Sequence, residues 1–190
     1  AMQTLAKLAV AAILLGSAGL AAAAPRPLLA AKSRIDFSVK EMGVTVSGQF
    51  RKFDAVIDLD PAKPEASKAE VTVDIASLTT GDADADAIAV DKPWLNKLDF
   101  PKATFKSTAV KGTAANRYEV KGQLTIRGKS REITVPLVTE PQTDGSIVAS
   151  GELSIKRSDF AIGGGEWNEG DVVANDVPVK FRLTLGAAAR

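Results

Sequence analysis

The feature that most constrains the fold is an alternation of apolar and polar residues with a period of two, which runs through most of the chain from Lys32 onward. In the first such run, Ile35, Phe37 and Val39 alternate with polar residues. This period is typical of a half-buried β-strand, because successive side chains point to opposite faces of a sheet. Eight runs follow this rule, around residues 34–40, 44–59, 70–75, 103–110, 118–126, 133–137, 147–155 and 177–185.

The connections between these runs are mostly short and rich in turn-forming residues, as in residues 41–43 and 142–145. Short connections indicate antiparallel neighbours. Eight such strands can stack as a sandwich or close into a barrel with room for a core or one slender ligand, and we favour an all-β, eight-stranded up-and-down barrel. An outer-membrane barrel would need aromatic girdles, whereas the few Trp, Tyr and Phe residues here are scattered along the chain.

The long run over residues 44–59 changes its inward face part-way along. Its apolar residues are even-numbered up to Phe50 and odd-numbered from Phe53 onward. A bulge or sharp bend at Arg51 and Lys52 would return both halves to one buried face.

Two long connections interrupt the pattern. Residues 78–102 form a polar, alanine-rich insert between the third and fourth strands, in which residues 84–90 are expected to form a short helix and Pro93 to start a second turn. The acidic run at Asp82 fails as a calcium loop, since its sixth and twelfth positions are Ala87 and Pro93, and is expected to cap the helix. A glycine-rich loop lies between residues 157 and 176, and such long excursions are often lids or binding loops.

The first residues resemble a secretory signal peptide. Residues 1–24 contain one early Lys, a short apolar run and an alanine-rich end, although a retained N-terminal anchor is the alternative. We therefore expect a single lipid-binding barrel domain over residues 32–186. An exported chain with no cysteine suits the periplasm.

Composition argues against several classes of function. The chain has no Cys and no His, which excludes thiol nucleophiles, histidine relays and Cys/His zinc sites. Paired carboxylates such as Asp159 and Glu166 have no predicted mutual geometry, so no catalytic residue and no metal site are assigned. Basic and acidic residues nearly balance, which gives no electrostatic case for nucleic acid.

The candidate site residues are therefore those of a ligand-binding barrel. Alternation points one apolar set inward as the expected barrel lining, namely Ile35, Phe37, Val39, Phe50, Val73, Phe105, Leu124, Ile126, Val135, Leu153, Ile155, Phe181 and Leu183. Large apolar residues on the two excursions are expected to line an entrance or to plug that end as core, namely Trp94, Leu95, Leu98, Phe100, Phe160 and Trp167. A hairpin tip carries Arg127, Lys129 and Arg131, which would either hold a headgroup or serve solubility alone.

Four segments together resemble the YceI-like family. They are SRIDFSVKEMGVTVSGQFRKFDAVIDLD, ASLTTG with an insert ending in KPWLNKLDFPKATFKST, GQLTIRGKSREITVPL, and SIKRSDFAIGGGEW. The resemblance implies a lipocalin-like barrel, commonly periplasmic, that encloses a long polyisoprenoid or similar amphiphile, without catalysis. Many relatives carry histidines after the first strand and in the insert, where this sequence has Glu41, Asp86 and Ala87.

We therefore expect a soluble periplasmic carrier for an isoprenoid lipid such as a quinone or a polyprenyl phosphate, with no other cofactor. The alternative is a ligand-free barrel that serves as an interaction or stress-response protein. Transient contact with a membrane or a membrane redox protein, and a homodimer, are partners compatible with this interpretation.

Overall fold

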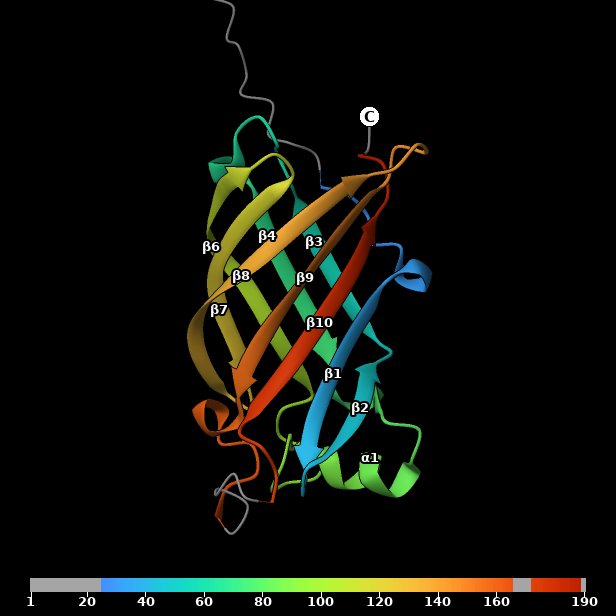
Figure 1. Ribbon diagram of the computed structural model, residues 1–190, viewed down its shortest axis with the longest axis vertical. Helices are drawn as coiled ribbons and strands as arrows, with labels where there is room; N and C mark the ends of the chain where they lie inside the picture. Colours follow the sequence, from blue (N-terminus) through green and yellow to red (C-terminus); the bar gives the residue numbers. More distant parts are fainter. Residues whose placement is uncertain (1–24, 166–171, 189–190) are drawn as a thin grey trace, which may run out of the picture.

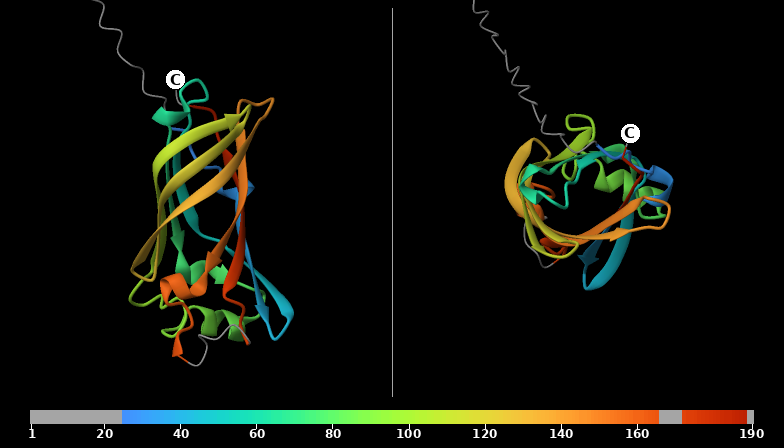
Figure 2. Two further views of the ribbon diagram at one scale, coloured as in Figure 1. Left: turned by 60° about the vertical axis from the view of Figure 1, so that its left-hand side comes forward. Right: turned by 90° about the horizontal axis from the view of Figure 1, so that it is seen from above.

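The computed structural model describes residues 25–165 and 172–188. In these ranges the chain forms one antiparallel sheet that curls into a barrel-like shape (Figures 1 and 2). The strands are β1 (Arg34–Glu41), β2 (Val44–Phe50), β3 (Phe53–Asp58), β4 (Lys68–Asp74), β5 (Leu78–Thr79), β6 (Lys102–Ala114), β7 (Arg117–Ile126), β8 (Lys129–Pro141), β9 (Ile147–Lys156) and β10 (Asp176–Leu185). One α-helix, α1 (Ala83–Ala89), and four 3₁₀ turns, η1 (Ala30–Lys32), η2 (Pro64–Ala66), η3 (Ile75–Ser77) and η4 (Arg157–Phe160), complete the described structure.

The strand order along the sheet is β3-β4-β6-β7-β8-β9-β10-β1-β2-β5. The described residues thus hold ten strands where eight are predicted, and α1 lies between β5 and β6. The difference arises at two places. The predicted strand over residues 44–59 is divided into β2 and β3, and η3 separates the short β5 from β4.

The break between β2 and β3 falls at Arg51 and Lys52, where the change of inward face predicted a bulge or bend. β2 pairs with β1 and β5, whereas β3 pairs with β4, so the two halves of this stretch have different neighbours. β3 is the first strand in the strand order and β2 is the last but one, so this stretch links the two edge regions of the curled sheet.

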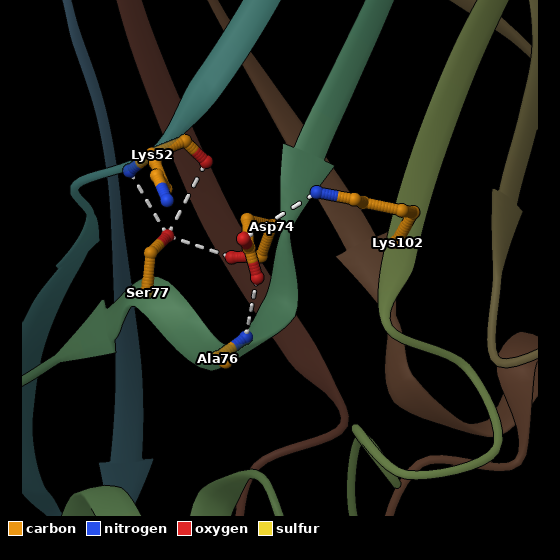
Figure 3. A network of polar contacts seen from close by, with 5 residues as sticks. All are labelled: Lys52, Asp74, Ala76, Ser77 and Lys102. Carbon is orange, nitrogen blue, oxygen red and sulfur yellow. Dashed lines mark hydrogen bonds and ion pairs between the residues drawn. The ribbon is translucent and has the colours of Figure 1, made fainter.

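A polar network fixes this bend (Figure 3). The Lys52 amide donates to the Ser77 hydroxyl oxygen over 3.0 Å, and the Asp74 amide donates to the Lys52 carbonyl over 2.9 Å. The Asp74 carboxylate accepts from the Ala76 amide and pairs with Lys102 at 3.4 Å. These contacts tie the bend to η3 and thereby set where the long strand changes partners.

One end of the barrel is closed by packed side chains. The segment before β1 reaches across this end, with isolated bridges from Arg26 to Ile57 and from Leu28 to Leu185. Leu185 is fully buried in a cluster that also contains Tyr118 and Val110. We refer to this as the far end.

The opposite end carries α1, η4 and the loops around them (Figure 1). Asp82 caps α1, since its carboxylate accepts from the amides of Asp84 and Ala85, as the sequence predicts. Within the described ranges, no helix is long and apolar enough to span a bilayer. The expected signal peptide lies outside the described residues.

Candidate functional site

The interior of the barrel is hollow and apolar along much of its length. A mouth chamber of about 480 Å³ lies at the α1 end, and an inner chamber of about 200 Å³ lies deeper among the strands. The two chambers share five lining residues that come from five different segments, namely Phe50, Leu95, Ile126, Ile155 and Val179. We call this shared ring the waist, and the two chambers adjoin there.

The structure places every predicted barrel-lining residue along this cavity. Phe37 and Val39 line the mouth chamber, while Phe50, Ile126 and Ile155 line both chambers. The remaining members line the inner chamber, namely Ile35, Val73, Phe105, Leu124, Val135, Leu153, Phe181 and Leu183. The alternation therefore predicts the inward face correctly, while contact of these side chains with a ligand stays a prediction.

The inner chamber is lined almost entirely by hydrocarbon. Among the described residues, Thr104 is its single polar lining residue and no charged residue lines it. An unpaired charge or polar headgroup is costly to bury in such surroundings. This chamber therefore suits an apolar tail.

The mouth chamber has a different chemical character. Its wall combines apolar residues with Glu41, Thr80 and Arg157. Met42 and Ile88 also lie on this wall and are 79% and 61% exposed, so the apolar surface continues from the cavity to the outside. An amphiphile can thus place its tail inside and its polar part at the mouth.

Arg157 is a second charged residue of the mouth wall, beside Glu41. The alternation of apolar and polar residues does not predict its position there. It is 4% exposed, and its guanidinium donates to the carbonyls of Ile162, Gly163, Val173 and Ala174. Burial lowers the pKa of this guanidinium from its ordinary value. Because the accepting carbonyls belong to both ends of the loop that follows η4, Arg157 holds those ends together at the mouth.

Only some of the residues expected at the entrance line the mouth chamber. Trp94 and Leu95 line the mouth chamber as expected, and the Arg157 guanidinium lies 5.3 Å from the centre of the Trp94 ring. Phe160 is 2% exposed and belongs to a core cluster, which is the plug that the sequence left as an alternative. Trp167 lies outside the described residues.

Two further entrance predictions are wrong. Leu98 is 86% exposed and lines neither chamber, and Phe100 lies against Gly128 and also lines neither chamber. Leu98 and Phe100 follow the turns of residues 91–99, whose direction the strand pattern does not specify.

The headgroup expectation for the hairpin tip is also not met by the geometry. Arg127, Lys129 and Arg131 line neither chamber. Arg127 and Gly128 form the turn with φ values of 51° and 71°, and the Arg127 guanidinium donates to the carbonyls of Ala161 and Lys92. The Arg127 guanidinium therefore connects the loop at Ala161 with the loop at Lys92. Lys129 and Arg131 are exposed on β8.

Electrostatics at the mouth favour an ordered α1. The Asp86 carboxylate accepts from both the amide and the hydroxyl of Thr80, each over 2.7 Å. These hydrogen bonds lower the pKa of Asp86, the side-chain bond from Thr80 contributing most. The ionised Asp86 thus fastens α1 to the residues that follow β5.

The comparisons with known proteins agree with this architecture. The family model of the YceI-like domain matches residues 28–185, which is nearly all of the described chain. The chain belongs to the YceI-like family. Among YceI-like relatives, a UPF0312 protein of Pseudomonas savastanoi pv. phaseolicola is 37% identical over 102 residues, which cover 53% of each chain. The chain thus matches about half the length of this relative.

Two solved structures share the fold. BcnA of Burkholderia cenocepacia is 38% identical to this YceI-like chain, with a TM-score of 0.79 over 83% of this chain and 98% of that one. A polyisoprenoid binding domain of Saccharophagus degradans has a TM-score of 0.71 over 86% of this chain and 99% of that one. At 19% identity the latter shows the fold alone.

Proposed function

We propose that this protein binds an amphiphilic lipid of the isoprenoid class, with the tail in the barrel and the polar end at the mouth, and carries it through the periplasm. It acts by binding instead of catalysis. The observation that carries this proposal is the pair of adjoining apolar chambers, of which the inner one has Thr104 as its one polar lining residue among the described residues.

The physical chemistry of the cavity supports a carrier. Burying a methylene group is worth about 0.8 kcal/mol relative to water, so a long tail strongly prefers the barrel to solution. Relative to a bilayer interior the same gain nearly vanishes, which allows the lipid to exchange. The exposed Met42 and Ile88 would support transient contact with a membrane at the moment of exchange.

Membership of the family adds a second line of support. The Saccharophagus degradans protein of the same fold is described as a polyisoprenoid binding domain. Because its identity to this chain is only 19%, it supports the ligand class and not the contacts of a particular lipid.

Two measurements test the proposal. The first is organic extraction of the gently purified protein followed by mass spectrometry, in which we expect an isoprenoid lipid in near-stoichiometric amount. The second is titration of the delipidated protein with geranylgeraniol, using displacement of the apolar dye N-phenyl-1-naphthylamine.

A matched pair of variants on β9 makes the titration specific. Leu153 lines the inner chamber, whereas the next residue, Ser154, is exposed on the outer face. Leu153→Asn places an amide in the cavity and should weaken binding at least tenfold, while Ser154→Asn should leave it unchanged. A protein that yields no lipid and binds neither dye nor geranylgeraniol would overturn the proposal in favour of a ligand-free interaction protein.

A further inference from the structure

Three phenylalanines inside the barrel each lie against a glycine of a neighbouring strand. Phe37 of β1 faces Gly48 of β2, and Phe181 of β10 faces Gly151 of β9, each as a directly paired residue. Phe105 of β6 reaches diagonally over Gly122 of β7. A Cβ atom at Gly122 or Gly151 would lie 2.6 Å from the ring carbon Cζ of its phenylalanine, and one at Gly48 would overlap the Phe37 ring.

This arrangement determines how much of the interior stays empty. A side chain at these positions would force the rings to move, and at Gly122 and Gly151 its Cβ would also overlap the backbone oxygens of Lys106 and Pro136. Glycine lets each ring lie along the wall instead, as rings over sheet glycines do. Phe105 and Phe181 therefore form the lateral walls of the inner chamber without filling it.

The inner chamber also has a floor. Ile57, Val120 and Leu183 line it, but on the same strand faces the next residues toward the far end do not. These residues are Leu59, Tyr118 and Leu185, all buried in the far-end cluster. In the described part of the chain the cavity is thus open at the mouth and blocked by packed side chains at the far end.

We propose that the inner chamber measures the length of the ligand's apolar tail, and that Phe105 and Phe181, laid against Gly122 and Gly151, set its capacity. This inference rests on the proposed lipid-binding function and assigns these two rings as specificity-determining residues. A tail enters through the waist and gains contact with every added carbon until it fills the space between the two rings and the floor. Further carbons must fold back or remain in the mouth chamber.

The test uses delipidated protein and a series of n-alkyl maltosides from octyl to hexadecyl, held below their critical micelle concentrations and monitored by dye displacement. Affinity should rise about fourfold per added methylene while the tail is extending into the cavity. It should then stop rising at one tail length. Phe105→Ala and Phe181→Ala should each move this break to a longer tail.

Control variants distinguish the loss of a wall of the inner chamber from a loss of folding. Phe53→Ala removes a ring that packs on the far-end cluster without lining either chamber, and it should leave the break where it is. Phe181→Leu keeps an apolar side chain and should move the break less than Phe181→Ala. Thermal melting identifies any variant that does not fold. If Phe181→Ala does not fold, the position of the break is compared between wild type and Phe181→Leu.

The outcomes distinguish the two proposals. If the wild-type protein binds no maltoside of any tail length, the lipid-binding function itself fails. If the maltosides bind but affinity rises across the whole series, or if the break is the same in every variant, the measuring role is overturned and the binding function stands.

Discussion

The guanidinium of Arg157 stacks against the ring of Trp94 at 5.3 Å from the ring centre, at the place where the cavity opens. Trp94 comes from the insert between β5 and β6, and Arg157 begins η4 after β9. The contact therefore joins the two long excursions of the chain. A carbon of the Trp94 ring would also lie 2.5 Å from a Cβ at Gly163, so the glycine allows this close approach.

Replacing Arg157 by Lys should destabilise the protein. Lysine keeps the charge but cannot donate to four carbonyls in two directions, so buried acceptors lose their partners. We expect a loss of about 2 to 4 kcal/mol in the free energy of unfolding, measured by urea titration. Arg131→Lys, on the exposed face of β8, should change it by less than about 0.5 kcal/mol. Equal effects of the two variants would contradict the holding role of Arg157.

Gly48→Ala should narrow the mouth chamber. The new methyl group would meet the ring of Phe37, which must turn toward the cavity. We expect several-fold weaker dye binding and a stability loss of about 1 to 3 kcal/mol, as for other overpacked sites. Gly164→Ala is the control, because no atom lies within 4 Å of its Cβ position. Unchanged dye binding in Gly48→Ala would show that the ring does not limit the cavity.

Asp86→Asn should loosen α1 in a manner that depends on pH. The folded-state pKa of Asp86 lies below its ordinary value, so its contribution to stability is present above the unfolded pKa of about 4 and is lost as pH falls through the folded pKa. Wild type should therefore be more stable than Asp86→Asn near neutral pH, with the gap closing in acid.

Urea unfolding at a series of pH values measures this difference. Asp84→Asn serves as the control, since Asp84 is exposed on the same helix. A stability gap between wild type and Asp86→Asn that stays constant down to pH values below 3, roughly a unit under the ordinary carboxyl pKa, would contradict the role of the ionised carboxylate.

The exposed apolar residues of the mouth should accelerate lipid exchange with membranes. Met42, Ile88 and Val172 line the mouth chamber and are exposed. Changing all three to Ser should slow dye transfer to phosphatidylcholine vesicles about tenfold or more, because burial of each side chain at the bilayer surface is worth roughly 1 to 2 kcal/mol. Val56→Ser, at an exposed site on β3, should have no effect. Equal transfer rates for the triple variant and wild type would show that the mouth does not dock.

The sequence predicts the inward face well because the period-two pattern acts through local geometry. Each lining residue, from Ile35 to Leu183, needs only its own strand to point inward. The sequence predicts the bend at Arg51 for the same reason, because a switch from even-numbered to odd-numbered apolar residues must be corrected within the strand. The sequence does not predict the number of strands, because this number depends on η3 and on the pairing of β5, which are tertiary features.

The mouth was predicted less well. Leu98, Phe100 and Phe160 are all large and apolar, yet one is exposed, one covers a turn glycine and one is core. Composition cannot distinguish these three environments, because the turn directions in the insert decide the first two and the packing of η4 decides the third. Arg127 and Arg157 were equally hard to place, since their partners are backbone carbonyls that sequence patterns do not reveal.

The far-end closure also determines how this protein can be handled. Arg26 and Gly186, near the two ends of the described chain, lie at the closed end, where the Gly186 amide donates to the Pro27 carbonyl. A linker joined directly at either end of the described residues would start from the side opposite the mouth. Protein immobilised in this way would present its opening to the surrounding solution, so a surface coated with it could capture lipids without further orientation.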